Sequence, residues 1–230
     1  GRLSSNKPNL QNIPIKTELG RKTRKAFVSR DSESYILAAD YSQIELRIIA
    51  DFSGDTEMIK AFKEEKDIHS TTASKVFNVD INDVTKDMRR RAKEVNFGII
   101  YGISPFGLSQ NLNIPRAEAK EIIDSYFNQF KSVKKYMETS IELAREKKHV
   151  STILGRRRYL RDIDSRNYTL RSFAERNAIN TPIQGSAADI IKLAMIKISR
   201  WMKKNNLKSK MIMQVHDELV FDVKKNELEL

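Results

Sequence analysis

The sequence predicts an α+β protein in which strand-forming segments near both ends of the chain share one antiparallel sheet. Two stretches carry this prediction. The apolar run SYILAADY (34–41) ends on Asp40, and MIMQVHDELVFDV (211–223) reads as two strands joined by a tight turn. The chain between them has mainly helical patterns. We therefore expect the helical middle to be an insertion into a sheet-bearing domain.

The remaining elements follow from local patterns. Ile44, Ile48 and Phe52 recur at helical spacing, so the strand ending at Asp40 leads into a helix. The helix over 85–102 has Thr85 as its N-cap. The other expectations are a helical region over 56–77, a helix that begins at Pro115, a second, long amphipathic helix through about Lys147, a small hairpin around Gly155, a helix from about Thr169 that is interrupted near Thr181–Gly185, and irregular, turn-prone chain over 7–14.

Composition narrows the function classes. The 230 residues include 42 Lys and Arg against 30 Asp and Glu, a net charge of +12, which favours a polyanionic partner such as nucleic acid. A merely solvated basic surface is the alternative, and so is an anionic membrane surface. The absence of Cys excludes disulfides and thiolate zinc sites, so a catalytic metal is expected to be a hard ion such as Mg²⁺. No apolar run approaches the ~20 residues that span a bilayer.

The helix over 85–102 has a distinctive face. Arg89, Lys93, Phe97 and Tyr101 are spaced four apart, so two cations and two aromatic rings lie in line. A nucleotide has the same order, with phosphates at one end and a flat base at the other. A solvated basic face that merges into buried aromatic rings is the alternative.

Asp40 and Asp217 each lie at the end of an apolar strand-like run. A buried carboxylate without a partner is costly, and two such acids can converge on divalent ions that promote phosphoryl transfer. The turn at His216 and Asp217 has no Gly, Asn or Pro, the residues that usually favour a hairpin turn. Ordinary acids at the edge of a sheet, paired with Arg or Lys, are the alternative.

Other polar residues are less specific. Glu45 lies among apolar residues and needs a partner, which could be a Tyr, Arg47 or a ligand group. Arg2, Arg176 and Gln184 belong to polar segments for which plain solvent exposure is the simplest explanation.

Five segments resemble those of family A DNA polymerases, the bacterial DNA polymerase I type. They occur in the family's order over nearly the whole chain: GRLSSNKPNLQNIP (1–14), DYSQIELR (40–47), RRRAKEVNFGIIYG (89–102), ERNAINTPIQGSAADIIK (175–192) and QVHDELVFDV (214–223). The resemblance implies a palm, an antiparallel sheet with packed helices, and a mainly helical fingers insertion.

It also implies a division of the chain. Residues 1–52 would form the first part of the palm, 53–171 the fingers, with 85–102 as the mobile helix, and 172–230 the second part of the palm with the hairpin 211–223. The thumb would lie before Gly1 and the last palm segment beyond Leu230. This agrees with a chain that opens on Gly and not Met.

The resemblance implies roles for individual residues. Metal binding would fall to Asp40, Asp217 and the Tyr41 carbonyl, and catalysis also to Glu218 near the primer end and to Lys93, the acid for the pyrophosphate leaving group. Nucleotide contacts would come from Arg89, Lys93, Phe97, Tyr101, His69, Gln43 and Glu45, the last of which resembles the steric gate against a ribose 2′-hydroxyl. Primer–template contacts would come from Arg2, Arg176, Asn180, Gln184 and His216.

The implied activity is template-directed DNA synthesis from deoxynucleoside triphosphates, with two Mg²⁺ ions for which Mn²⁺ can substitute. The implied protein is a monomer, not bound to a membrane, in the cytoplasm of a bacterium or encoded by a phage. A single-subunit RNA polymerase is the nearest alternative, and Glu45 argues against it. The other alternative is a truncated DNA-binding fragment with little activity alone, although Asp40, Asp217, Arg89 and Lys93 are all present.

Overall fold

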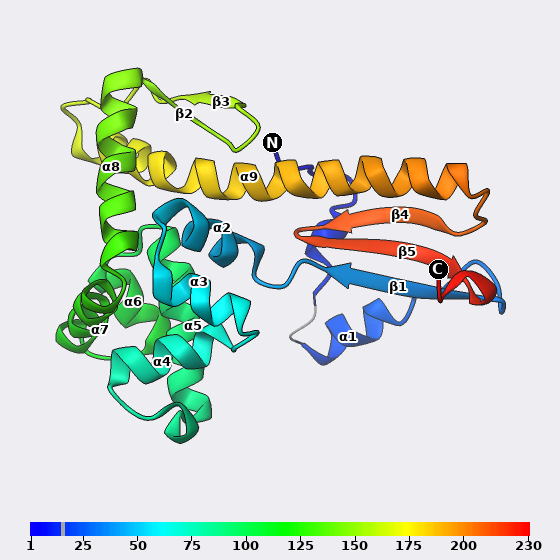
Figure 1. Ribbon diagram of the computed structural model, residues 1–230, viewed down its shortest axis with the longest axis horizontal. Coiled ribbons are helices and arrows are strands. Elements are labelled where there is room, and N and C mark those ends of the chain that lie inside the picture. Colours follow the sequence, from blue (N-terminus) through cyan, green and yellow to red (C-terminus); the bar gives the residue numbers. More distant parts are fainter. Residues whose placement is uncertain (15–16) are drawn as a thin grey trace. The chain divides into compact units, whose positions relative to one another are not determined.

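The computed structural model describes residues 1–14 and 17–230 and divides the chain into two compact units (Figure 1). Unit 1 consists of residues 1–44 and 187–230, and unit 2 consists of residues 45–186. The chain therefore leaves unit 1, builds the whole of unit 2 as one continuous segment, and returns. The α+β class is confirmed.

Unit 1 contains a three-stranded antiparallel sheet with the strand order β1-β5-β4. Its strands are β1 (Ser34–Asp40), β4 (Lys210–Val215) and β5 (Glu218–Lys224). The prediction that both ends of the chain contribute to one sheet is thus confirmed. In the register of β1 and β5, Ser34 is opposite Lys224, and Asp40 is opposite Glu218.

One face of this sheet packs against the C-terminal part of helix α9 (Tyr168–Lys204). Alternate residues of β5 point to this face, as the twofold period of a strand requires. They form a core with residues spaced three or four apart on the helix: Leu219, Phe221 and Val223 of β5 with Ile191, Met195, Ile198 and Met202 of α9. This core makes β5 a rigid support for the carboxylates at its beginning.

Helix α9 is continuous, so the predicted interruption near Thr181–Gly185 is wrong. Pro182 lies inside the helix, but the apolar side chains around it, such as Ala178 and Ile183, are fully buried, and their packing outweighs the lost hydrogen bond. Gly185 is present for another reason. A Cβ there would lie 2.4 Å from Cγ2 of Thr152, because the 152–156 turn packs directly on the helix.

Unit 2 is mainly helical. Helix α5 (Lys86–Ile100) begins where the sequence predicts, since the Thr85 hydroxyl accepts a hydrogen bond from the Met88 amide. The region 56–77 is split into two helices, because Asp55 and Asp67 each cap a new one. The other elements are α2 (Ile44–Ser53), α3 (Thr56–Lys63), α4 (Ile68–Phe77), α6 (Pro105–Leu112), α7 (Arg116–Gln129), α8 (Lys131–Lys147), and the predicted hairpin of β2 (His149–Ser151) and β3 (Arg157–Tyr159).

The N-terminal segment contains one short helix that the sequence did not predict. Helix α1 (Glu18–Arg24) is capped by the Thr17 side chain, and a 3₁₀ turn (Leu10–Asn12) is capped by Asn9. Short polar helices such as α1 have no apolar stripe for a sequence pattern to reveal, so the sequence did not predict this helix. None of the helices in the described residues is long and apolar enough to cross a membrane.

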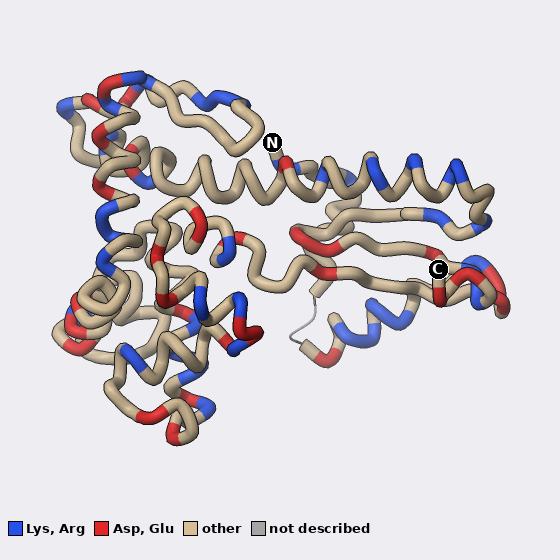
Figure 2. Tube along the Cα trace, viewed as in Figure 1, with Lys and Arg blue, Asp and Glu red and all other residues tan. Residues whose placement is uncertain are grey.

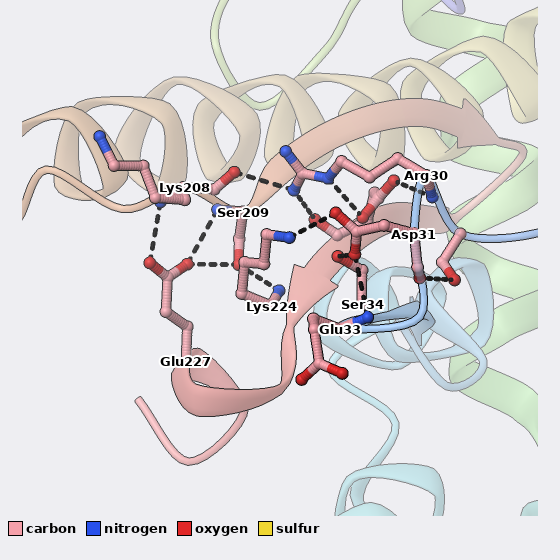
Figure 3. A network of polar contacts seen from close by, with 10 residues as sticks. Arg30, Asp31, Glu33, Ser34, Lys208, Ser209, Lys224 and Glu227 are labelled. Atoms are coloured by element: carbon pink, nitrogen blue, oxygen red, sulfur yellow. Dashed lines mark hydrogen bonds and ion pairs between the residues drawn. The ribbon is translucent and has the colours of Figure 1, made fainter.

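A polar network closes the end of the sheet that lies opposite Asp40 (Figure 3). Arg30 donates from Nε to the nearly buried carboxylate of Asp222 at 3.0 Å, and from Nη2 to the carbonyl of Lys208 at 2.8 Å. Glu227 accepts from the backbone amides of Lys208 and Ser209, both at 2.8 Å. The network thus ties the segment before β1 to β5 and to the residues just before β4.

Removing one partner of this ion pair should destabilise unit 1. We expect Arg30→Met to lower the free energy of unfolding by about 3 kcal/mol, because it leaves the Asp222 carboxylate in a desolvated position without its cation. The fluorescence of Trp201, the chain's single Trp, reports on unit 1 during urea unfolding. Lys22→Met, which breaks the exposed pair with Glu18, is the matched control and should change little. A loss no larger than that of the control would show that the pair does not support the sheet.

Candidate active site

The sheet of unit 1 brings the carboxylates of Asp40 and Asp217 together. β1 ends at Asp40, directly opposite Glu218, and the Tyr41 amide donates to the Asp217 carbonyl at 3.1 Å. Burial raises the pKa of the Asp40 carboxyl, and the charge of Asp217 raises it further. The negative charges of these two carboxylates repel one another. A hard divalent cation bound between them would relieve this repulsion.

The donor set is small. Among the described residues, no group of three or more His, Cys, Asp or Glu side chains forms a ready-made metal site. The predicted donors are the carboxylates of Asp40 and Asp217 and the Tyr41 carbonyl, which also accepts the Ile44 amide at 3.3 Å. Such all-oxygen donors fit Mg²⁺, which usually keeps several waters and takes only one or two carboxylates from a protein.

The hairpin turn works without Gly because His216 adopts the left-handed conformation itself, with φ 55°. His is one of the non-Gly residues enriched in that region. Gln214 stabilises the turn, since its side-chain Nε2 donates to the His216 carbonyl at 2.7 Å. Gln11 in turn donates from Nε2 to the Gln214 carbonyl at 3.2 Å, which ties the N-terminal segment to β4. Neither Gln was predicted as a site residue.

In unit 2, the predicted nucleotide-binding face lies on α5. Arg89 and Lys93 are exposed, Phe97 is half-buried and Tyr101 follows the helix at its C-cap. Arg89 is ion-paired with Asp67, the N-cap of α4. Burial works to raise the pKa of the Asp67 carboxyl, but the hydrogen bonds from Arg89, Ser70 and the His69 amide outweigh it and lower that pKa. A helix cap therefore also orients one of the predicted phosphate ligands.

The carboxylate of Glu45 has a hydrogen-bond partner in unit 2. Only 8% of this residue is exposed, and its Oε2 accepts a hydrogen bond from the Tyr101 hydroxyl at 2.6 Å. Of the partners that the sequence left open, a Tyr is therefore confirmed. The bond joins the start of α2 to the end of α5, and it holds the carboxylate in place.

His69 lies in a buried polar group that the sequence did not reveal. Its Nδ1 is 3.1 Å from Nδ2 of Asn96, and the Asn96 amide also bonds the Thr72 hydroxyl. Burial lowers the pKa of the His69 ring to about 4; the charge of Asp67 opposes this effect, whereas Arg89 and Lys93 reinforce it. The ring also lies near Phe97, with centroids 5.8 Å apart.

Arg176, Asn180 and Gln184 are spaced four apart, so they line one face of α9 within unit 2. Gly102, at φ 68°, allows Arg176 to lie against the end of α5, where a Cβ would come within 2.9 Å of the Arg Cγ. The buried Oδ1 of Asn180 has no hydrogen-bond partner among the described residues. The other predicted DNA contacts, Arg2 and His216, lie exposed in unit 1, and Gln43, at φ 56°, lies in the same unit.

The whole chain is similar to known proteins. The sequence model described as "DNA polymerase family A" matches residues 1–230. The chain belongs to DNA polymerase family A. It is 56% identical over 229 residues to DNA polymerase I of Bacillus caldotenax, and 55% identical over 229 residues to that of Streptococcus pneumoniae. These alignments cover 100% and 99% of the chain but only 26% of each relative, so the chain spans about a quarter of the length of these curated relatives.

A solved structure agrees with this family A assignment. The chain is similar to the POL domain of Pol1 from M. smegmatis, which was solved in complex with DNA primer-template and dNTP. The TM-score is 0.95 at 49% sequence identity, and the match covers 100% of this chain and 40% of that one. The likeness extends over both units, which include the carboxylates of unit 1 and the α5 face of unit 2.

The low pKa of His69 in this family A chain can be measured directly. We expect the imidazole to titrate near pH 4 by NMR. The ordinary value is 6.5, so the unfolded state binds more protons between these values; the stabilisation by the neutral ring is present above pH 6.5 and is lost as the pH falls towards 4. The signal that disappears in His69→Gln identifies the ring. A titration midpoint above 6 would contradict the buried, neutral state.

Proposed function

We propose that this chain carries the polymerase active site of a DNA-directed DNA polymerase, which adds deoxynucleotides to a primer 3′-hydroxyl on a DNA template and releases pyrophosphate. The observation that carries the proposal is the pair Asp40 and Asp217. β1 ends at Asp40 beside the turn that carries Asp217, far away in the sequence, and burial and the charge of Asp217 both raise the pKa of the Asp40 carboxyl. Family membership and the likeness to a polymerase solved with primer-template and dNTP support it.

In unit 1, Asp40, Asp217 and the Tyr41 carbonyl would hold Mg²⁺, in the form of two ions, with Mn²⁺ as a substitute. Such cations, when bound, make the primer hydroxyl more acidic and neutralise charge on the leaving pyrophosphate. Glu218 stands opposite Asp40 in the ladder, and we place it near the primer end. The apolar core under β5 keeps these carboxylates fixed, so little reorganisation accompanies the reaction.

In unit 2, α5 would bind the incoming nucleotide. Arg89 and Lys93 would neutralise phosphate oxygens, and Lys93 would donate the proton to the pyrophosphate oxygen that leaves. Phe97 and Tyr101 would pack on the sugar and base. Glu45, held by Tyr101, would exclude a ribose 2′-hydroxyl, because an added hydroxyl has no space beside a fixed carboxylate. We assign a supporting nucleotide contact to Gln43.

The duplex would be held mainly through backbone and shape. Arg176, Asn180 and Gln184 on α9, together with Arg2 and His216, are the proposed primer–template contacts. Base pairing supplies the sequence information, so these contacts need not distinguish one base from another. Since a net charge of +12 favours phosphate contacts, binding should weaken steeply with salt. We place the parent protein, as a monomer, in the bacterial cytoplasm near the nucleoid or in a phage-infected cell, with a role in replication or repair.

The test is extension of a primed DNA template with Mg²⁺ and deoxynucleotides, both by residues 1–230 and by the natural full-length polypeptide. Extension by the full-length protein with deoxynucleotides supports the proposal. Equal use of ribonucleotides would favour the alternative of a single-subunit RNA polymerase. DNA binding without extension by the full-length protein would favour a non-catalytic DNA-binding role. Extension by the full-length protein alone would show that residues 1–230 are a fragment with little activity by themselves.

A further inference from the structure

Three polar side chains lie inside the apolar contact between α4 and α5 in unit 2. Thr72 and Asn96 are fully buried, and His69 is 3% exposed. Their neighbours on α5 include Val95 and Ile99, which are also buried. Polar groups at such positions are costly unless they bond one another, and these three form a continuous hydrogen-bonded chain. Apolar side chains would pack at these positions without this cost. We therefore expect the three polar side chains to have a function beyond packing.

The direction of these bonds follows from chemistry. An amide nitrogen can only donate, so Nδ2 of Asn96 donates and Nδ1 of His69 accepts. The Thr72 hydroxyl contacts both ends of this amide, since it donates to Oδ1 of Asn96 at 3.1 Å and accepts from Nδ2 at 3.0 Å. A neutral imidazole that accepts at Nδ1 carries its proton on Nε2. A protonated ring would instead place two N–H groups against each other.

We infer that Asn96, supported by Thr72, is a positioning residue that fixes the His69 ring in the tautomer that donates a hydrogen bond from Nε2 to the triphosphate of the incoming nucleotide. The inference rests on the proposed function only for the identity of the acceptor. The tautomer itself follows from contacts within unit 2.

In this arrangement Arg89, Lys93 and His69 make different contributions to binding of the triphosphate. Arg89 and Lys93 supply positive charge, whereas His69 supplies one directed donor and no charge. Charged groups near the ring have opposite effects on its protonation, since Asp67 favours the cation and Arg89 and Lys93 oppose it. The amide bond from Asn96 adds a further bias towards the neutral form, because it is lost when Nδ1 takes up a proton.

The tautomer can be measured without any assay of activity. Two-bond ¹H–¹⁵N correlation spectra of the chain labelled with [¹⁵N]His distinguish a protonated from an unprotonated ring nitrogen. We expect an unprotonated Nδ1 and a protonated Nε2 for His69 at pH 7. Asn96→Asp, which has the same shape but replaces the donor by an acceptor, should move the proton to Nδ1 or produce the doubly protonated ring. Thr72→Ser, which keeps the hydroxyl, should preserve the wild-type pattern.

Asn113→Asp is the matched control, because it makes the same chemical change on the exposed C-cap of α6. It should leave the His69 pattern unchanged. Circular dichroism shows whether each variant is folded. If Asn96→Asp does not fold, the His69 pattern is compared between Thr72→Val, which lacks the hydroxyl, and Thr72→Ser, which keeps it. A protonated Nδ1 in the wild type would overturn the inference, and so would a wild-type pattern in a folded Asn96→Asp variant.

The functional arm uses the full-length polypeptide. Asn96→Asp should raise the KM for deoxynucleotides about tenfold, with a smaller effect on kcat, whereas Thr72→Ser and Asn113→Asp should resemble the wild type. A changed tautomer with an unchanged KM would overturn the link to the triphosphate. Failure of the wild type to use deoxynucleotides at all would instead refute the proposed function, and the spectra would still decide the role of Asn96.

Discussion

Asp217→Ala is expected to reduce primer extension by the full-length protein at least about a thousandfold, while the fold remains intact. Asp217 lies at a tight turn and its side chain is not part of an apolar core. We therefore expect the alanine variant to have nearly the wild-type free energy of unfolding. Burial would still raise the pKa of Asp40, but the smaller contribution from the charge of Asp217 is lost, and only one carboxylate remains for the proposed divalent ion. The rate is measured as single-nucleotide addition to a labelled primer with saturating DNA.

Two controls make this result specific. Asp83→Ala removes an exposed carboxylate in unit 2, far from Asp217 in the sequence, and should leave extension unchanged. Asp217→Asn keeps the shape of the side chain, so a loss comparable to that of the alanine variant would show that the charge is what matters. A gel-shift assay should find primer–template affinity within a few-fold of the wild type. Extension by Asp217→Ala at the wild-type rate would refute the metal-binding role.

Glu45→Ala is expected to raise the use of ribonucleotides relative to deoxynucleotides roughly a hundredfold, because it opens the space beside the sugar. The structure adds a second variant. Tyr101→Phe removes the hydroxyl that holds Glu45 at 2.6 Å, so the carboxylate remains but is less fixed. This variant should show a smaller rise in the same ratio.

The comparison of the two variants separates steric exclusion from other effects. The measurement is the ratio of kcat/KM for a ribonucleotide and its deoxynucleotide on the same template. Glu57→Ala, an exposed carboxylate on α3, is the control and should not change the ratio. An unchanged ratio in Glu45→Ala would show that another group excludes the 2′-hydroxyl.

Local patterns predicted most of the elements. Helix α5 with its Thr85 cap, the 149–159 hairpin and the shared sheet all have signals within a few residues, either hydrophobic periodicity or a capping side chain. The error at Pro182 and Gly185 arose because local propensity favours a break, whereas buried neighbours and the approach of Thr152 decide the structure. Such contacts join residues far apart in the sequence, and a single sequence does not reveal them.

The residues of the candidate site likewise divide into those with a local sequence signal and those that only contacts distant in the sequence reveal. The ends of strand-like runs pointed to Asp40 and Asp217 as candidates, and a spacing of four pointed to the face of α5; these roles stay predictions. Asn96 and Thr72 were not predicted, because they have the same local appearance as any polar residue of a helix, and only the structure shows that they are buried and hydrogen-bonded to one another. Asp67 could have been found from its capping position before α4, although its ion pair with Arg89 could not.

The discontinuity of unit 1 has a consequence for biosynthesis. β1 leaves the ribosome long before its hydrogen-bonding partner β5, since all of unit 2 is translated between them. Tyr35, Ile36 and Leu37 of β1 are exposed even in the finished sheet, so the nascent chain carries an apolar strand with an open edge. We expect unit 2, a continuous segment, to fold first and to shorten the loop that must close. Protease sensitivity of β1 should therefore persist in nascent chains stalled before β5 and disappear once β5 has emerged.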